Sequence, residues 1–318
     1  MLPEEAIKKT QQELNKNVSK WKERYEDYVT ETANNKDDIM GRRKKFHKWS
    51  NLNVYSTIGK AKDNSNYFDL RYQGQSVGQI SVSKRDNSVK LHISKRQYSN
   101  NCDEKYLKGY PKDVCKEGCY SWHSKEAKEF RKYFKSNPGK QGHPEHKYEN
   151  LLLKELFRND GKNKSLTYIQ PVTIGKDIFF QMPTPLTASG NEIKYSDGHG
   201  GIDILARRRE GNKSTLTIFE LKDEYNPPKK VICQAIAYAT FIVELCKTKA
   251  YEKFCELCGL EKQKIDTIYV SILMPDPGNG KEPDFKPNVL SVPDSEIKLE
   301  LHYTFFDKNS VKITRTSL

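Results

Sequence analysis

Residues 200–222 read GGIDILARRREGNKSTLTIFELK, and this stretch decides the fold. Two apolar runs, IDILA and LTIFELK, flank a polar connection that contains Gly-Asn. Each run carries an acid where Val or Ile would pack better: Asp203 in the first run and Glu220 in the second, with Lys222 two residues further on. We therefore expect two paired strands whose polar residues serve chemistry and not packing.

Alternation along a strand predicts where these side chains point. It places Ile202 and Ile204 on one face with Asp203 on the other, and it places Glu220 and Lys222 on a shared face. If the strands pair, Asp203, Glu220 and Lys222 converge. Two close carboxylates repel each other, and a divalent cation removes that penalty. The alternative interpretation is an edge strand whose three polar residues form a surface salt bridge.

Oxygen ligands of this kind suit Mg²⁺ or Mn²⁺. Such a cation polarises a phosphate and lowers the pKa of a bound water, and a lysine beside it orients that water or stabilises charge on phosphorus. The residues therefore predict a site for metal-assisted cleavage of phosphodiester bonds.

The order of the surrounding elements resembles the PD-(D/E)xK nuclease superfamily: a helix with Glu, a strand, a strand with Asp, a strand with Glu-x-Lys, and a helix. Asp203, Glu220 and Lys222 match the signature of this family, although Asp203 follows Gly-Ile and not Pro. The resemblance implies that Asp203 and Glu220 ligate the metal and that Lys222 positions the nucleophile. It also implies that Glu149, on the first core helix, assists at the metal directly or through water.

Two further motifs extend the resemblance to roughly residues 140–245. The RecB-like branch of the superfamily adds Gln-x-x-x-Tyr on the next helix, and QAIAY supplies Gln234 and Tyr238 on one helical face. These two residues would orient Lys222 or the substrate. The segment GHPEHKYE resembles a group of bacterial proteins of unassigned role that carry a His-Pro-Glu-x-x-x-Glu helix. The family acts mostly on DNA and often as dimers, so the resemblance implies a deoxyribonuclease and allows a homodimer.

The predicted fold class is α/β, with a restriction-endonuclease-like core in which helices flank a mixed central sheet, over residues 141–318. An α+β region precedes it: a helical basic segment over 1–50, then a small antiparallel module with a basic helical segment over 51–140. Within this region, residues 4–32 predict one or two exposed helices, and the period of two over 52–95 predicts a meander. The C-terminal part predicts a helix over 145–159, a hairpin over 166–183, a helix over 227–246 and a strand over 266–275.

The charge of the chain favours an anionic partner. Lys and Arg number 55 against 42 Asp and Glu, a net charge of +13, which points to nucleic acid first and an acidic membrane surface second. In GRRKKFHKWS, residues 41–50, Phe46 and Trp49 lie among basic residues, so this stretch is either a solvated connector or a phosphate contact with aromatic stacking. No apolar run reaches the ~20 residues of a membrane helix, and the N-terminal sequence lacks the apolar core of a signal peptide, so we expect a cytoplasmic protein without a membrane partner.

Several other residues are weaker candidates for the site. His143 and His146 either cap and solvate the helix or contact phosphate, and His199 lies close to Asp203 in sequence. Glu145 is the substitute for Glu149 as the helix carboxylate. One basic run faces either a DNA backbone or solvent: Arg207, Arg208 and Arg209.

The seven cysteines offer a second metal hypothesis. One set has a spacing that could hold structural zinc: Cys102, Cys115, Cys119 and His123. Some nucleases of the Gln-x-x-x-Tyr branch bind an iron–sulfur cluster through four cysteines, and a second set here offers three without a fourth placed beside them: Cys246, Cys255 and Cys258. Ordinary thiols in a reducing compartment are the simpler interpretation.

Two rival functions stay open. One is a non-catalytic nucleic-acid-binding or scaffold protein that retains the nuclease fold. The other is an interaction protein whose basic first half docks on an acidic partner. Steeply salt-dependent DNA binding would separate phosphate contact from a protein partner.

Overall fold

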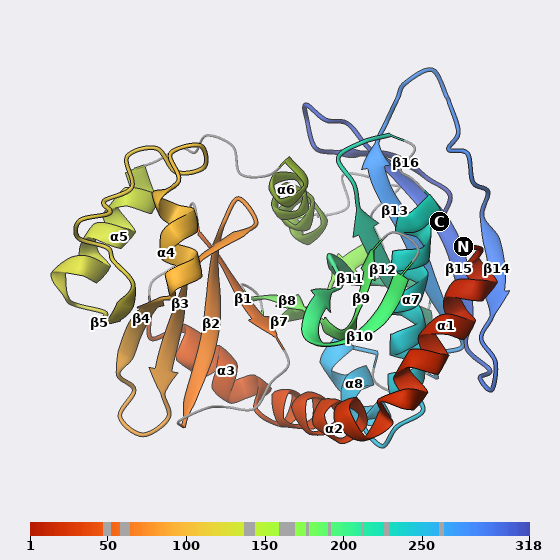
Figure 1. Cartoon of the computed structure of the whole chain (residues 1–318), viewed down its shortest axis with the longest axis horizontal. Coiled ribbons are helices and arrows are strands. Elements are labelled where there is room, and N and C mark those ends of the chain that lie inside the picture. The colour runs from red at the N-terminus through yellow and green to blue at the C-terminus, as the bar shows by residue number, and fades with distance from the viewer. Residues whose placement is uncertain are drawn as a thin grey trace.

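The computed structural model describes residues 1–46, 52–57, 64–136, 144–158, 169–175, 178–189, 192–211, 213–225, 229–260 and 264–318. In this part of the chain the strands form two large sheets and one two-stranded ribbon. Figure 1 shows the two sheets side by side, with helix α6 (Pro144–Arg158) near their junction. The predicted mixed α/β class is confirmed.

The first sheet, which we call the N-terminal sheet, has the strand order β5-β4-β3-β2-β1-β8-β7. Its strands are β1 (Asn53–Thr57), β2 (Ser65–Tyr72), β3 (Gln75–Ser83), β4 (Val89–Ile93), β5 (Gly118–Ser121), β7 (Thr173–Ile174) and β8 (Ile178–Gln181). Strands β1 to β4 pair antiparallel in sequence order, so the predicted meander is confirmed. Gln73 and Gly74 join β2 to β3 with φ of 49° and 81°, the left-handed pair that a two-residue hairpin turn requires.

Strand β1 connects this sheet to the later part of the chain. Its neighbour on one side is β2, and its neighbour on the other side is β8, which pairs with it in parallel and sets Val54 opposite Ile178. The sheet therefore extends past the boundary that was predicted near residue 140.

The chain passes from one sheet to the other at Val172. Strand β6 (Ile169–Pro171) pairs with β11 in the second sheet, whereas β7 pairs antiparallel with β8 in the first. Between them, the Val172 N–H donates to the Leu205 carbonyl at 2.8 Å. The hairpin predicted over 166–183 is thus confirmed at β7 and β8, but its first part belongs to the other sheet.

The second sheet, the C-terminal sheet, has the order β14-β15-β13-β12-β11-β6, with β16 paired to β15. Strands β12, β13 and β15 run parallel, and β11 is antiparallel to both β12 and β6. The bounds are β11 (Ile204–Glu210), β12 (Lys213–Leu221), β13 (Thr267–Pro275), β14 (Asn288–Ser291), β15 (Lys298–Phe306) and β16 (Ile313–Thr316).

Helices cover both faces of this sheet. Phe219 and Leu221 of β12 pack in one core with Leu152 of α6, while Ile218 packs in a second core with the residues of helix α7 (Lys229–Cys246). Helix α7 also forms the crossover between the parallel strands β12 and β13, as a parallel pair requires. The residues along the middle of α7 are apolar on nearly every side of the helix, as expected of a helix enclosed by other elements.

Strands β9 (Pro183–Ser189) and β10 (Glu192–Gly201) form the ribbon, whose register shifts between Tyr195 and Gly200. Gly200 lies against the backbone of β9, where an added Cβ would overlap the Leu186 carbonyl oxygen and would lie 3.2 Å from the Tyr238 hydroxyl. Only glycine fits between the ribbon and α7 at this position.

Three helices precede the first sheet: α1 (Pro3–Lys16), α2 (Val18–Asn34) and α3 (Lys36–Arg43). Figure 1 shows them running from α7 along the lower edge of the molecule to the N-terminal sheet. The rings of Trp21 and Tyr25 meet Phe241 of α7 edge-on, with centroids 5.7 and 5.0 Å apart. The prediction of exposed helices was therefore wrong: the few apolar residues recur at helical spacing and form a buried stripe.

Three shorter helices complete the fold: α4 (Lys95–Cys102), α5 (Lys125–Ser136) and α8 (Tyr251–Cys258). Ala127, Phe130 and Phe134 of α5 are fully buried, at positions that share one face of the helix. Phe46 is also buried and its ring contacts those of Phe68 and Trp122 at 5.3 and 6.0 Å. Phe46 is therefore a core residue that cannot stack on a base, and Trp49 lies outside the described residues.

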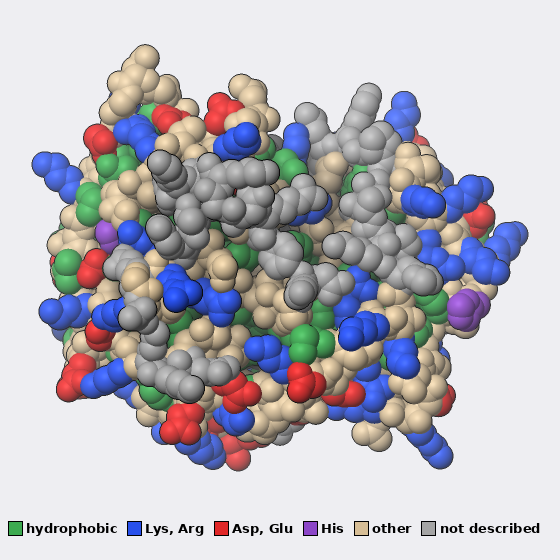
Figure 2. Space-filling view, turned by 180° about the vertical axis from the view of Figure 1, so that it is seen from behind, with side chains coloured by type: hydrophobic (Ala, Val, Ile, Leu, Met, Phe, Trp, Pro, Cys, Tyr) green, Lys and Arg blue, Asp and Glu red, His purple; other side chains and the backbone are tan. Residues whose placement is uncertain are grey.

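Lys and Arg side chains are spread over the face seen in Figure 2, with Asp and Glu between them. Charge alone does not mark a single binding track on this face. No helix among the described residues is long and apolar enough to cross a membrane.

Candidate active site

The β11–β12 hairpin brings the two predicted strand acids together. Ile204 pairs with Phe219, so Asp203, which directly precedes β11, lies beside Glu220. Asp203 Oδ2 accepts a hydrogen bond from the Leu221 N–H at 2.9 Å, which fixes its carboxylate against β12. Glu220 is only 1% exposed. The strand pairing predicted from residues 200–222 is confirmed.

One detail of that prediction was wrong. Ile202 and Ile204 do not share a face, because Ile202 packs in the core around α7 and Ile204 packs in the core under α6. The chain bends at Asp203, and regular alternation begins only at Ile204. At this bend the Asp203 carboxylate accepts its hydrogen bond from Leu221, the last residue of β12.

Lys222 accompanies Glu220, as their spacing predicted. The Lys222 Nζ lies 3.1 Å from Glu220 Oε1, and the lysine side chain is 20% exposed. The Lys222 N–H donates to the Leu273 carbonyl of β13 at 2.8 Å. The ammonium group therefore balances a buried carboxylate and keeps partial access to solvent.

Helix α7 adds the glutamine and tyrosine of the Gln-x-x-x-Tyr motif. Gln234 Nε2 donates to the Tyr238 hydroxyl at 3.4 Å. Burial, together with the negative charges of Glu220 and Asp203, raises the pKa of Tyr238 to about 12, against the opposing effects of the Gln234 hydrogen bond and Lys222. The Tyr238 hydroxyl thus lies within the electrostatic field of all three strand residues.

Glu149 on α6 is the third predicted acid, and an arginine from another part of the chain holds it. It is 3% exposed, and its Oε1 lies 3.6 Å from Nη1 of Arg71, a residue of β2. Arg71 also donates to Gln181 of β8 through Nη2, and to Asp69 Oδ2 through Nε at 2.8 Å. A guanidinium from the N-terminal sheet therefore holds the helix carboxylate.

Arg71 was not among the residues predicted for the site. Asp69 and Arg71 are two residues apart in a strand and so share a face, but nothing in the sequence pairs them with Glu149. Their contact depends on β1 and β8 joining one sheet, so that β2 comes to lie near α6.

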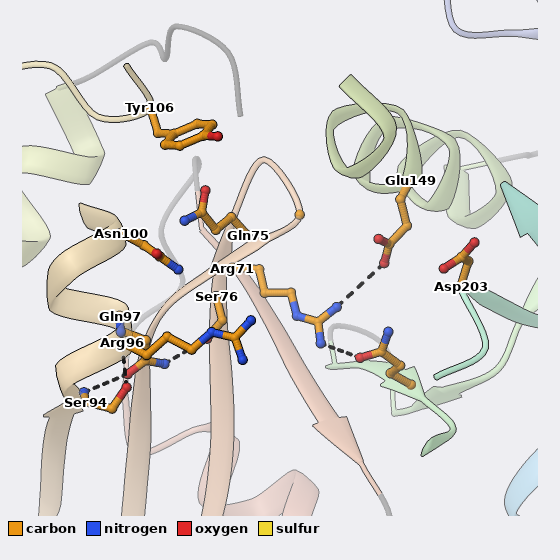
Figure 3. A pocket seen from close by; sticks show the side chains of 12 residues that line it. Arg71, Gln75, Ser76, Ser94, Arg96, Gln97, Asn100, Tyr106, Glu149 and Asp203 are labelled. Atoms are coloured by element: carbon orange, nitrogen blue, oxygen red, sulfur yellow. Dashed lines mark hydrogen bonds and ion pairs between the residues drawn. The ribbon is translucent and has the colours of Figure 1, made fainter. Parts of the chain in front are cut away.

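Glu149 and Asp203 line a pocket of about 660 Å³ between the two sheets. Figure 3 shows these two acids on one side and polar side chains of α4 and the β2–β3 hairpin on the other, with Arg71 between them. The remaining lining residues are Gly74, Gln75, Ser76, Ser94, Arg96, Gln97, Asn100, Tyr106 and Gln181. The pocket therefore joins part of the candidate site to the N-terminal sheet.

The weaker candidates fall into two groups: histidines and a glutamate whose side chains lie outside the described residues, and an arginine run that contacts the protein itself. His143 lies outside the described residues, as do the side chains of Glu145, His146 and His199. Each residue of the arginine run contacts the protein itself: Arg207 binds Gln170 and Gly259, Arg208 lies over the Tyr269 ring, and Arg209 binds the Gly211 carbonyl.

All seven cysteines are outside disulfides. Cys119 Sγ lies 4.0 Å from His92 Nε2, and Cys115 is buried with its pKa raised to about 12 by burial. Over the described ranges, no three His, Cys, Asp or Glu side chains are grouped so that they could hold a metal ion. This applies to the candidate zinc set and equally to Glu149, Asp203 and Glu220.

Together the site offers two adjacent carboxylates, a lysine and a protonated tyrosine beside a polar pocket. This combination can bind a cation and act on a polar, anionic substrate. No protein-family model matches this chain, and comparisons with curated proteins and with solved structures give no match either.

Proposed function

We propose that this chain is a metal-dependent nuclease that hydrolyses phosphodiester bonds, with DNA as the substrate that its resemblance to the PD-(D/E)xK superfamily implies. The observation that carries the proposal is the gathering of Asp203, Glu220, Lys222 and Tyr238 at one end of the β11–β12 pair. A buried carboxylate such as that of Glu220 is costly, and a second carboxylate beside it calls for a compensating partner.

The order of the elements supports this proposal. The order along the chain is α6, β6, β11, β12, α7 and β13, interrupted only by β7 to β10 between β6 and β11, if the short helix α8 is left aside. The four strands named here are neighbours in one mixed sheet. This is the order that the resemblance to the PD-(D/E)xK superfamily implies, with Asp203 just before the second strand and with Glu220 and Lys222 at the end of the third.

The donor chemistry at the site fits a hard divalent cation. Asp203 and Glu220 would hold Mg²⁺ or Mn²⁺ through carboxylate oxygens, with Glu149 assisting directly or through water. When bound, such a cation polarises the phosphate and lowers the pKa of a coordinated water.

The chain's own groups supply orientation and positive charge. Lys222 offers an ammonium group next to Glu220, where it can hold the attacking water or stabilise negative charge on the phosphate. Tyr238 keeps its proton at neutral pH, because burial raises its pKa to about 12. Gln234 donates a hydrogen bond to the Tyr238 hydroxyl oxygen. The Tyr238 O–H can therefore donate in turn to a group beside Lys222 or to the substrate.

The test is cleavage of linear, circular and single-stranded DNA in the presence of Mg²⁺, Mn²⁺ or EDTA. We expect cleavage with either metal, none with EDTA, and a loss of about 100-fold or more in Asp203→Asn and in Lys222→Ala. The matched controls are Asp266→Asn and Lys213→Ala, which alter an exposed pair at the other end of β12, 2.6 Å apart. Full activity in Asp203→Asn would overturn the site assignment.

A second candidate is a nucleic-acid-binding protein that retains this fold without catalysis. It is favoured by the internal pairing of the acids, because Lys222 pairs with Glu220 at 3.1 Å and Arg71 with Glu149 at 3.6 Å. Metal-independent, steeply salt-dependent DNA binding without cleavage in any metal would favour this candidate.

A further inference from the structure

We infer that the pocket between α4, the β2–β3 hairpin and the candidate acids receives an unpaired nucleotide of a single strand. We call this the nucleotide pocket. The inference rests on the proposed function, because it assigns a substrate form to the same site. It assigns the recognition of that substrate to the N-terminal sheet, outside the motifs that carry the catalytic proposal.

The size of the pocket favours a single strand. At about 660 Å³ it falls within the range of sites that enclose small molecules, roughly 300–1,000 Å³. One unstacked nucleotide is a ligand of that class. A double helix is not, since its major groove alone is about 12 Å wide.

The chemistry of the far wall suits a base and its phosphate. Gln75 and Asn100 carry amides that both donate and accept, which matches the mixed edge of a base. Tyr106 offers a half-buried ring on which a base can stack. Arg96 is exposed at the start of α4 and reaches across toward the side where Arg71 lies, so it offers a charge for the phosphate (Figure 3).

Hydrogen bonds hold this wall in position. The Ser94 N–H donates to Gln97 Oε1 at 2.9 Å, and Gln97 Nε2 donates to Ser76 Oγ at 2.7 Å. The Ser76 hydroxyl in turn donates to Asp69, the same carboxylate that binds Arg71.

The network therefore runs from the start of α4 to the guanidinium that holds Glu149. These bonds hold together α4 and the β2–β3 hairpin, which carry Arg96, Asn100 and Gln75, so the two elements need little rearrangement when a ligand binds. The same network sets the distance between the binding wall and the acids.

The experiment measures binding of short fluorescent oligonucleotides by anisotropy, in EDTA so that no strand is cut. We expect the single strand to bind at least tenfold more tightly than the blunt duplex of the same sequence. Arg96→Ala should weaken single-strand binding by about tenfold or more, because it removes a charge-assisted contact. Tyr106→Ala should weaken it by about 5- to 160-fold, the usual effect of losing one stacked base.

Lys95→Ala is the matched control for Arg96→Ala. Lys95 is the neighbouring residue of α4, is also exposed and carries the same charge, but it does not line the pocket. We expect Lys95→Ala to change the affinity by less than about twofold, the small effect of an exposed charge without a close contact. Equal losses in Arg96→Ala and Lys95→Ala, or equal binding of the duplex and the single strand, would overturn the nucleotide pocket.

Cleavage assays on the same preparations separate this inference from the proposed function. Single-strand binding that depends on Arg96 and Tyr106, without metal-dependent cleavage, supports the pocket and contradicts the nuclease. Metal-dependent cleavage that Arg96→Ala and Tyr106→Ala leave unchanged contradicts the pocket and supports the nuclease. Far-ultraviolet circular dichroism checks that each variant is folded.

Discussion

Arg71 is the side chain that ties the candidate site to the rest of the molecule. Burial lowers the pKa of its guanidinium, but the charges of Asp69, Tyr55 and Glu149 outweigh burial and hold that pKa above its ordinary value. Its guanidinium carbon also lies 4.2 Å from the centre of the Tyr55 ring. Arg71 therefore stays charged between two carboxylates and an aromatic face.

We predict that Arg71→Ala lowers the free energy of unfolding by about 3–5 kcal/mol, because it removes the cation beside the buried Glu149 carboxylate and the half-buried Asp69 carboxylate. Denaturant unfolding followed by circular dichroism measures this change. The matched control is Arg24→Ala, whose partner Asp197 is 70% exposed at 3.4 Å, and which should cost less than about 1 kcal/mol. Equal costs in the two variants would contradict a special role for Arg71. Adding Glu149→Gln should restore part of the loss.

At this scale the sequence predicted the residues that are close together along a strand or helix. The spacing of Glu220 and Lys222 placed them side by side, and the spacing of Gln234 and Tyr238 placed them on one face of a helix. Arg71 and the wall of the nucleotide pocket could not be predicted in this way. Their positions depend on which strands pair across the sheets, and local periodicity does not encode that choice.

The β11–β12 hairpin shows what could be predicted for whole elements. Two long alternating runs with a short polar connection leave few alternatives to a hairpin, and the structure contains it. Strand β6 is different, because it has only three residues and only Val172 separates it from β7. Nothing in so short a sequence indicates that β6 and β7 pair in different sheets. The length of an element therefore decided how well its partner could be predicted.

The close approach of β9 and β10 gives a prediction for the ribbon. Gly200→Ala should lower the free energy of unfolding by about 1–3 kcal/mol, because the new methyl group would overlap the Leu186 carbonyl and force the strands apart. Gly41→Ala is the control, since Gly41 lies in α3 with nothing within 4 Å of an added Cβ. That change should raise stability by up to about 1 kcal/mol. Thermal unfolding measures both, and a neutral Gly200→Ala would contradict the tight contact.

Across the whole molecule, the two halves share more structure than the sequence suggested. Composition and the polar stretch near residue 140 predicted a division there, and strand β8 joins the earlier sheet all the same. Helices α1 and α2 cover α7, which belongs to the later part of the chain. Contacts between segments far apart in sequence cannot be seen in the amino-acid composition. For this reason the sequence predicted a domain boundary that the N-terminal sheet crosses.

We therefore predict that residues 141–318 do not fold on their own. The fragment would expose Phe241 and the rest of the α7 surface that α1 and α2 bury, and β8 would lack the partner β1. Calorimetry should show a cooperative transition for the full chain and none for the fragment. Co-expression with residues 1–140 is the control, and it should restore a folded complex. A cooperative transition in the isolated fragment would contradict this prediction.

The parallel pairing of β1 with β8 also has a consequence for the newly made chain. A ribosome adds about 5–20 residues per second, so β8 emerges on the order of ten seconds after β1. During that delay the β1 edge of the nascent sheet has no strand to cover it, and an uncovered edge invites pairing with other chains. Chaperones that bind nascent chains would therefore find their target in β1, while the protein is still being translated.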